Sequence, residues 1–466
     1  MTWELYAACR EGAPDAPDVA ARVSLLTIGT LQADEKAKGQ ARDMYCSLVL
    51  KGERDAGCRG ARDLARRLGL FQPPVGSVTE LPPYSFLLSF TFRLRRPYLS
   101  RDDDTLYPID NPVKKDKVFR VPMVAAAGWK GSLRAAATAR LALRLRELVA
   151  AQETPGGDAS FALRARCVVL FGKESEAGAR LLNGIIAQCT GRDAAEAEEI
   201  GAAFEHYLVA HHLRSDGVDG RQGRLFCYST IFDRIGLEVI NPHDRARRVG
   251  RQPILIECVP SGTDGAFELL YVPFDLAGEG ETEIRCQVGL DLAWIATAVY
   301  DTMTTLGFGA KTSSGYGVTE DQLAVGRLLL NAPQINATGA GRAPAEVAAA
   351  TEPLPHYFVG ANQFHPNLLR PDGELKSEEE YRRDIEGKGR KYSKSQRQLY
   401  QKARKRWQKM ETAKQTGAGS GRPEEPTPAD QAAAKTTECT FTSLSDMVGV
   451  VSRLAATLAD DGGAQS

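Results

Sequence analysis

The sequence of 466 residues carries 59 Lys and Arg side chains against 59 Asp and Glu side chains, which gives a formal net charge of zero. This balance excludes a protein that coats nucleic acid by bulk attraction, so any such contact must come from local basic patches. The nine cysteines lack Cys-x-x-Cys spacing, which excludes the usual zinc and redox motifs, and no apolar run reaches membrane-spanning length. We therefore expect a soluble cytoplasmic protein with no membrane partner, built as two domains or as one domain with insertions.

Residues 1–83 are predicted to form an accessory region that is mainly helical. The run Ala33–Asp43 and the basic amphipathic run Gly60–Leu68 have helical patterns, and proline pairs at 73–74 and 82–83 break the pattern. We assign no chemistry to this region and expect it to pack against the core or against a neighbouring subunit.

The predicted core, residues 84–331, opens with a strand and a charged loop. Ser85–Leu94 alternates aromatic and aliphatic residues as strands do. The irregular stretch Arg95–Arg120 contains Ile109-Asp110-Asn111-Pro112-Val113. Asp110 is either an ordinary turn former, or a lone carboxylate that orients an attacking hydroxyl or holds a divalent ion. Further carboxylates that could assist it are Asp102, Asp103, Asp104 and Asp116.

An alanine- and leucine-rich helix is predicted from Gly128 to about Gln152. Lys130 and Arg134 are four residues apart at its start, so they lie on one helical face beside N–H groups that the helix start leaves unpaired. Such a face can bind a phosphate. A solvated basic helix start would have the same pattern.

The middle of the core is predicted to mix helices and strands. Phe161–Phe171 is apolar and predicts extended chain, whereas Glu176–Ala210 predicts a helix. The apolar runs Pro253–Val259 and Ala266–Pro273 are joined by a glycine-containing turn, which predicts a hairpin. Two further strands are predicted at Gly223–Thr230 and Ile235–Ile240.

A basic loop is predicted between Ile240 and Pro253. It contains a His243-Asp244 pair, but Pro242 does not suit the helices from which metal phosphohydrolases take their ligands. A loop that follows an RNA backbone fits better, with a solvated face as the alternative. The candidate phosphate-binding residues are Arg245, Arg247, Arg248 and Arg251.

A glycine-rich loop connects a predicted amphipathic helix, Leu290–Leu306, to extended chain at Val318–Leu330. Glycine at this density permits positive φ and lets backbone N–H groups approach a phosphate. A nucleotide P-loop is excluded because Ala310 rather than glycine precedes Lys311, and because helix precedes strand here. The reversed order also excludes a dinucleotide fingerprint. The candidate RNA-binding residues are Gly307, Phe308, Gly309, Lys311, Gly315, Tyr316 and Gly317.

Phe308 and Tyr316 are the aromatic residues of this loop. Aromatic side chains in such positions can stack on the bases of single-stranded RNA. Packing of the same rings into the sheet is an equally good interpretation of the sequence.

The composition changes several times after the core. Residues 332–375 are rich in Ala, Gly and Pro and predict a linker followed by a strap, a segment that packs back onto the core. Residues 376–414 predict a basic helical segment with interleaved aromatics, which fits RNA contact or a solvated face. Residues 415–437 predict a disordered linker. Residues 438–466 predict an amphipathic helix, with its pattern over Phe441–Leu458, that needs a surface to cover its apolar face.

Two of these motifs together resemble the RAMP superfamily, the RNA-binding proteins of CRISPR–Cas systems. Gly307-Phe308-Gly309, five residues, then Gly315-Tyr316-Gly317 is similar to the glycine-rich loop of that superfamily. The helix start Lys130-Gly-Ser-Leu-Arg134 and the preceding Asp110-Asn-Pro-Val are similar to motifs of the backbone subunits of type III effectors. The run Pro122–Trp129 departs from the usual Pro-Gly-Ser-Ser-Leu of the family. The resemblance covers about Ser85–Asn331.

The resemblance implies an α+β fold with a ferredoxin-like (RRM-like) core that carries insertions, which the predicted order of strands and helices also favours. It implies a CRISPR RNA-binding subunit of a type III-like antiviral effector complex. The implied partners are guide RNA, complementary target RNA and other effector subunits.

Asp110 is then the expected catalytic residue of a metal-dependent endoribonuclease, with Mg²⁺ or a similar divalent ion as cofactor and with metal ligands unassigned. The alternative is a non-catalytic structural or capping subunit of the same kind of complex. A guide-processing endonuclease is a weaker interpretation, because such enzymes usually place a general-base histidine between the first strand and first helix. Ser85–Gln152 contains no histidine.

Overall fold

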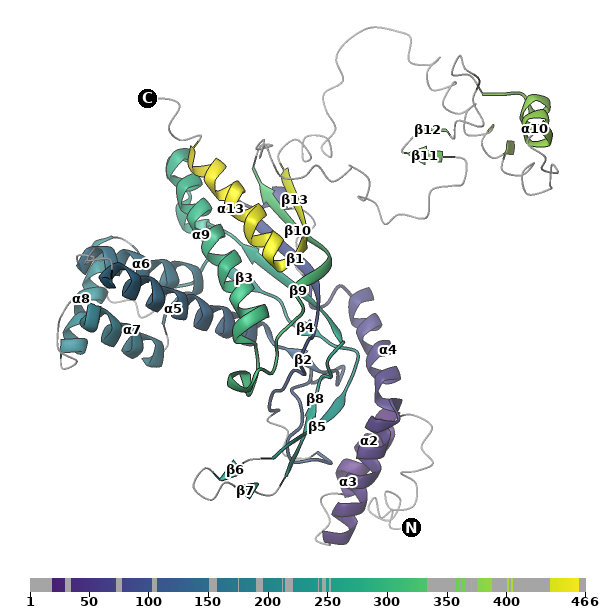
Figure 1. Cartoon of the computed structure of the whole chain (residues 1–466), viewed down its shortest axis with the longest axis horizontal. Helices are drawn as coiled ribbons and strands as arrows, with labels where there is room; N and C mark the ends of the chain where they lie inside the picture. Colours follow the sequence, from purple (N-terminus) through teal and green to yellow (C-terminus); the bar gives the residue numbers. More distant parts are fainter. Residues whose placement is uncertain are drawn as a thin grey trace, which may run out of the picture. The chain divides into compact units, whose positions relative to one another are not determined.

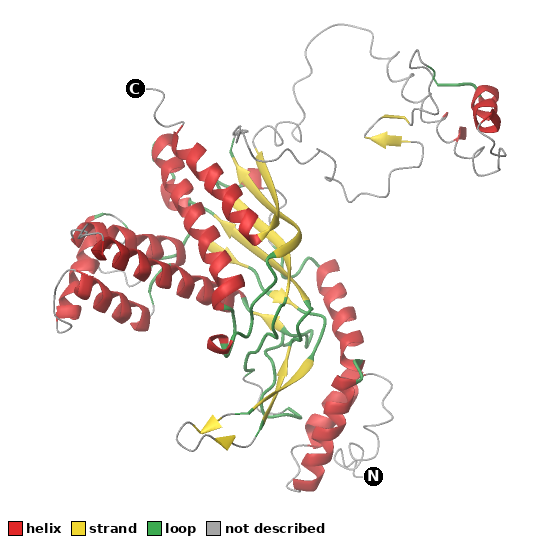
Figure 2. Cartoon of the chain, in the orientation of Figure 1, coloured by secondary structure: helices red, strands yellow, loops and turns green. Residues whose placement is uncertain are grey.

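The computed structural model describes residues 19–29, 35–72, 78–102, 107–150, 157–174, 176–189, 196–211, 213, 221–241, 243–244, 249–250, 253–332, 358–360, 363–364, 370, 375–387, 400–401, 404 and 436–460. The chain divides into two units, one made of residues 1–340 with 429–466 and the other of residues 341–428. Helices and strands are mixed, and the main sheet is antiparallel (Figure 2). No helix among the described residues is long and apolar enough to cross a membrane.

The first unit is built on a five-stranded antiparallel sheet with the order β13-β10-β1-β9-β3. Its strands are β1 (Phe86–Arg93), β3 (Leu225–Cys227), β9 (Asp264–Tyr271), β10 (Gln322–Asn331) and β13 (Thr436–Ser443). The predicted strand at the start of the core is therefore confirmed and lies at the centre of the sheet.

Three helices pack with this sheet. Helix α5 (Ala126–Ala150) follows β1, and α9 (Glu281–Asp301) joins β9 to β10. Helix α13 (Leu444–Asp460) follows β13 and lies along α9 (Figure 1). Without β13 and α13, the chain order of these elements is β1, α5, β3, β9, α9, β10.

The core lies between the sheet and these helices. Alternate side chains of β1 point into it, because successive residues of a strand face opposite sides. Phe86, Phe90 and Phe92 are buried, and the Phe86 ring stacks on Tyr271 at 4.5 Å between ring centroids. Burying a side chain of this size stabilises the fold by about 1.5–3 kcal/mol.

The opposite face of the sheet mixes polar and apolar side chains, and Leu87 on β1 is paired in register with Leu270 and Leu329. Ser89 on β1 is paired in register with Glu268 on β9 and with Arg327 on β10. At the end of β1, the Arg93 Nε atom donates to Asp264 at 2.8 Å. In β1, β9, β10 and β13 this face carries no aromatic side chain. These four strands therefore offer no stacking platform for RNA bases, and the aromatic side chain on this face is Phe226 of β3, which pairs with Leu270.

A helical insertion between α5 and β3 packs against α5 (Figure 1). It consists of α6 (Gly157–Phe171), α7 (Glu176–Cys189) and α8 (Ala197–Ala210). Helix was predicted for the last two, but extended chain was predicted for Phe161–Phe171, and that prediction is wrong. The last four residues of α6 are all buried, and continuous burial hides the helical period that would distinguish a helix from a strand.

A buried charge network joins this insertion to the sheet and to α9. The Arg224 guanidinium donates to Asp275 at 2.7 Å and to Asp291 at 2.7 Å. Asp291 also accepts from Arg166 at 3.1 Å and from the Tyr271 hydroxyl at 2.8 Å. The Arg224 guanidinium holds the pKa of Asp275 below its ordinary value, although burial acts in the opposite direction. Every member has a partner, so the network fixes how these elements pack.

A second hydrophobic cluster lies between the N-terminal helices and a two-stranded ribbon. Its elements are α2 (Val19–Gly29), α3 (Glu35–Leu50), α4 (Glu53–Arg67), β2 (Met123–Val124), β4 (Thr230–Ile231), β5 (Gly236–Ile240) and β8 (Ile254–Cys258). Strand β8 pairs with β5 in an antiparallel ribbon. The predicted hairpin between β8 and β9 is therefore wrong, because β9 pairs with β1 and β3.

The remaining boundaries refine the sequence predictions. Helix α9 begins at Glu281 rather than Leu290, because the acidic residues in its first turn suit a helix N-terminus. The predicted C-terminal helix begins at Leu444, and Phe441 lies on β13. The apolar face of this helix packs on α9 of the same chain.

The smaller elements are η1 (Val78–Glu80), β6 (His243–Asp244), β7 (Val249–Gly250) and η3 (Phe274–Leu276).

The second unit contains β11 (Phe358–Gly360), β12 (Gln363–Phe364) and helix α10 (Glu378–Gly387). Glu380 on α10 accepts hydrogen bonds from the Arg370 guanidinium and the Ser377 amide, and the Tyr381 ring on α10 stacks on Tyr400 at 5.5 Å between ring centroids. Most of the predicted basic segment 376–414 lies outside the described residues.

Candidate nucleic-acid interface

The glycine-rich loop is a closed connection between α9 and β10, as its sequence predicted. Helix α9 passes through a π-helical turn, η4 (Thr302–Leu306), before the loop begins. The Phe308 amide donates to the Gly317 carbonyl at 3.0 Å, which holds the two Gly-aromatic-Gly groups side by side. The amides of Ala310 and Gly317 donate to the carbonyls of Leu99 and Pro97. The loop is therefore tied to the segment that follows β1.

Three glycines of the loop are required by the chain's own backbone. Gly307, Gly309 and Gly317 have φ angles of 76°, 90° and 70°. A Cβ atom at these positions would lie 2.4, 2.3 and 2.0 Å from a backbone carbonyl oxygen. Gly315 also has a positive φ of 82°, but no atom lies within 4 Å of the position of its Cβ.

Alanine at Gly317 is expected to lower the free energy of unfolding by about 2–4 kcal/mol, because it combines left-handed strain with a backbone collision. Alanine at Gly315 is the matched control and is expected to cost about 1–2 kcal/mol, since only the strain applies. Urea unfolding of the two variants measures both values. An equal loss in both would contradict this assignment.

The centre of the loop offers donors to a ligand. Lys311 is exposed with φ 59°, and it precedes the short turn η5 (Thr312–Ser314). The N–H groups of Lys311, Thr312 and Ser313 donate to no acceptor among the described residues. Together with the Lys311 ammonium they form the part of the loop that can meet a phosphate.

The two aromatic residues of the loop are engaged within the protein. Phe308 is 1% exposed, with ring centroids 4.4 Å from Trp129 and 5.5 Å from Tyr98. Of the two interpretations of Phe308, the structure shows packing into the core, and it leaves almost none of the ring exposed to stack on RNA. Tyr316 is half-buried near Glu238 on β5, and both burial and this carboxylate raise the pKa of the phenol.

The same contact brings the loop to the start of α5. Trp129, which packs on Phe308, directly precedes Lys130. Lys130 is half-buried over a hollow of about 300 Å³ lined by Phe226, Cys227 and Tyr228. Burial lowers the pKa of its ammonium. The glycine-rich loop and the helix start at Lys130 therefore form one continuous part of the structure.

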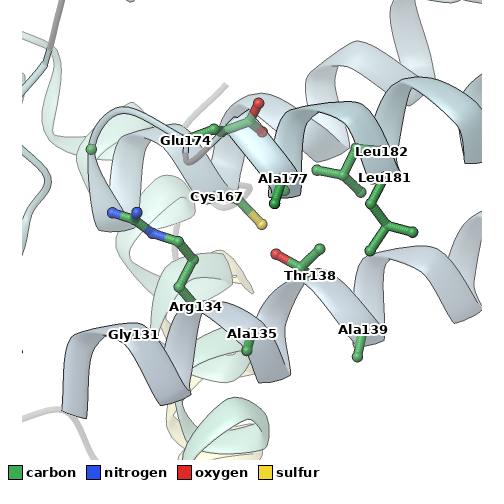
Figure 3. Close-up of a pocket in the computed structure, with 12 residues that line it drawn as sticks. Gly131, Arg134, Ala135, Thr138, Ala139, Cys167, Glu174, Ala177, Leu181 and Leu182 are labelled. Atoms are coloured by element: carbon green, nitrogen blue, oxygen red, sulfur yellow. The ribbon is translucent and has the colours of Figure 1, made fainter. Parts of the chain in front are cut away.

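Arg134 points to a different place. Its Nη2 atom donates to the Phe171 carbonyl at 2.6 Å, and the side chain lines a groove of about 440 Å³ between α5 and α7. Figure 3 shows Ala135 and Ala139 on α5 opposite Leu181 on α7. Arg134 thus contacts the helical insertion through Nη2, and the phosphate site predicted for Lys130 and Arg134 stays a prediction.

Asp110 lies on an exposed loop beside a cation. Its carboxylate is 84% exposed and is 3.9 Å from the Nη1 atom of Arg42 on α3. The backbone on its C-terminal side is bonded to β8, where the Glu257 amide donates to the Asn111 carbonyl at 2.9 Å. The loop is therefore fixed while the Asp110 side chain is free to meet a ligand.

The Asp110 loop is anchored by Glu257, a residue for which the sequence analysis predicted no role. Its carboxylate is fully buried and accepts hydrogen bonds from Val113 N at 3.0 Å, the Lys115 ammonium and the hydroxyls of Tyr45 and Tyr107. Burial lowers the pKa of Lys115 against the attraction of Glu257. The pKa of Tyr45 is raised by burial and by the same carboxylate. The sequence did contain a signal for this role, because Glu257 stands inside the apolar run Ile254–Cys258. A charge in a buried strand needs a partner.

The predicted helper carboxylates shape the loop. Asp102 accepts the Lys115 amide at 3.0 Å, and Asp116 accepts the amides of Val118 and Phe119. No group of three His, Cys, Asp or Glu side chains that could hold a metal ion occurs among the described residues. Asp110 could serve as one Mg²⁺ ligand if an RNA phosphate and water supplied the others. Further predicted residues lie outside the described part of the chain, namely Asp103, Asp104, Arg245, Arg247, Arg248 and Arg251.

The ribbon of β5 and β8 separates the two candidate sites. Leu237 and Glu257 are cross-strand partners, and Glu257 faces the Asp110 loop and the N-terminal helices. Glu238 pairs with Ile256 on the other face, and Glu238 contacts Tyr316 of the glycine-rich loop. The structure therefore joins the glycine-rich loop to α5 but places Asp110 at a site of its own.

Solved structures similar to this chain include a chain of the type III-B Cmr-beta complex bound to cognate target RNA. It is 14% identical, and the match covers 68% of this chain and 86% of that chain at a TM-score of 0.29. A chain of a CRISPR RNA-guided surveillance complex before nicking is 11% identical, with 53% and 78% covered and a TM-score of 0.28. At these values the likeness assigns no function to this chain. No protein-family model and no curated protein matches the sequence.

Proposed function

We propose that this protein is a RAMP-type, CRISPR RNA-binding subunit of a type III-like effector complex, and that it cuts target RNA at Asp110. Its core would be a ferredoxin-like unit. The chain order β1, α5, β3, β9, α9, β10 supports this, because it is the strand–helix–strand–strand–helix–strand order of that unit. Strand β13 then extends the sheet beyond β10.

The observation that carries the proposal is the packing of Phe308 on Trp129 at 4.4 Å. It joins the glycine-rich loop to the helix start at Lys130, two parts of the resemblance that are far apart in the sequence. Lys311, the free amides of η5 and Lys130 supply donors for the phosphates of a guide strand. Base pairing between guide and target would supply sequence specificity, so the protein needs to bind only backbone and shape.

Asp110 would act on the target strand as a general base. Its carboxylate would accept the proton of the ribose 2′-hydroxyl, the 2′-oxygen would bond to phosphorus, and the bond from phosphorus to the 5′-oxygen would break. Water would protonate the leaving 5′-oxygen. A divalent ion held by Asp110 would neutralise negative charge on the phosphate that is cut.

Asp110→Asn in the assembled complex is expected to lower target cleavage by about 10²–10⁴-fold, because asparagine cannot accept the proton. Guide RNA should be retained, since Asp110 lies apart from the glycine-rich loop. The measurement is single-turnover cleavage of a guide-complementary RNA, with and without Mg²⁺. Asp63→Asn, an exposed carboxylate on α4, is the matched control. Unchanged cutting by Asp110→Asn would reject the catalytic part of the proposal.

The second candidate is a structural or capping subunit that cuts nothing. It is favoured because no group of three His, Cys, Asp or Glu side chains that could hold a metal ion occurs among the described residues. In that case guide RNA would still co-purify, and Asp110→Asn would leave all cleavage products of the complex unchanged. Loss of guide RNA from the purified complex would contradict both candidates.

A further inference from the structure

Arg42 is the cation that the structure places beside Asp110, and it comes from the N-terminal region to which the sequence assigned no chemistry. Its Nη1 atom is 3.9 Å from the Asp110 carboxylate, and the two side chains are 42% and 84% exposed. An exposed ion pair of this kind contributes at most about 1 kcal/mol. The guanidinium is therefore available to another anion at little cost.

The buried carboxylate of Glu257 fixes the part of α3 that carries Arg42. Tyr45 lies one turn further along α3, and its hydroxyl donates to Glu257. The same carboxylate accepts from the Val113 amide and the Lys115 ammonium, which follow Asp110 on its loop. Arg42 and Asp110 come from separate parts of the chain, and the contacts of both segments with Glu257 hold the two side chains next to each other.

We propose that Arg42 is a second substrate-contacting residue at this site and binds a non-bridging oxygen of the phosphate that is cut. This inference rests on the proposed function. The planar guanidinium matches a phosphate with paired donors. A fixed cation here stabilises the negative charge that develops on the phosphate oxygens as the 2′-oxygen adds. The N-terminal helices would then be part of the active site and no longer only an accessory region.

The test uses the assembled complex with guide RNA and compares Arg42→Gln with Arg42→Lys. Arg59→Gln, an exposed arginine on α4, is the matched control. Arg42→Gln is expected to lower single-turnover cleavage by about 10²-fold, and Arg42→Lys by less because the charge remains. In an Asp110→Asn background, Arg42→Gln should reduce the salt slope of target-RNA binding by about 1. Arg59→Gln should change neither quantity.

The outcomes separate this inference from the proposed function. If Asp110→Asn abolishes cutting while Arg42→Gln leaves both cleavage and salt slope unchanged, the role of Arg42 is rejected and the proposed function stands. If Asp110→Asn cuts like wild type, the catalytic proposal fails and the role of Arg42 at the cut phosphate fails with it. If Arg42→Gln slows cleavage but, in the Asp110→Asn background, leaves the salt slope of target-RNA binding unchanged, Arg42 does not contact the phosphate. That result also overturns the inference.

Discussion

Replacing Asp291 by asparagine is expected to lower the free energy of unfolding by about 3–5 kcal/mol, because it leaves buried positive charge without its counter-charge. Asp291 is 2% exposed and accepts from Arg224 at 2.7 Å and from Arg166 at 3.1 Å. Arg224 is equally buried and would keep only Asp275 as a charged partner. Since the network joins α6, β3 and β9 to α9, we expect the insertion and the sheet to loosen together in urea unfolding.

Asp301→Asn is the matched control for this prediction. Asp301 is the last residue of the same helix, α9, and pairs with Arg140 at 2.9 Å, but the Arg140 side chain is 43% exposed. Its loss should cost about 1 kcal/mol or less. If the two asparagine variants were equally stable, burial of the Asp291 network would not be a determinant of stability.

Local patterns predicted the elements whose signals do not depend on distant residues. The alternation in Ser85–Leu94 gave β1, and the helix start at Lys130 gave α5. The density of glycine marked a tight connection after α9, and four positive φ angles at glycines of this loop show why. Gly307, Gly309 and Gly317 have a further reason that the local pattern did not reveal, because a Cβ atom at each would collide with the chain's own backbone.

Pairing and burial could not be predicted in the same way. Nothing in the run Pro253–Val259 shows that β8 pairs with β5 rather than β9, because the turn between β8 and β9 has ordinary hairpin chemistry. Burial of Phe308 depends on Trp129 and Tyr98, which lie far away in the sequence. The anchor of the Asp110 loop is likewise non-local, because Tyr45 and Glu257 are separated by 212 residues.

Glu257→Gln is the second change with a large expected effect, a loss of about 3–5 kcal/mol in the free energy of unfolding. Lys115 is buried and paired with Glu257, so a neutral amide would leave this buried cation without its counter-charge. The amide would also donate where the carboxylate only accepts, which disturbs the bonds from Tyr45 and Val113. Chemical denaturation with the wild type as reference measures the loss.

The same substitution should change the dynamics of the Asp110 loop more than those of the glycine-rich loop. Amide hydrogen exchange is expected to accelerate at Val113 and its neighbours, because the Val113 N–H loses its buried acceptor. Glu238→Gln is the matched control, since it lies on the other face of the same ribbon and contacts Tyr316. It should leave the Asp110 loop unchanged and cost about 1 kcal/mol or less. Equal exchange at Val113 in both variants would show that Glu257 does not anchor the loop, and the placement of Arg42 beside Asp110 would then lose its physical basis.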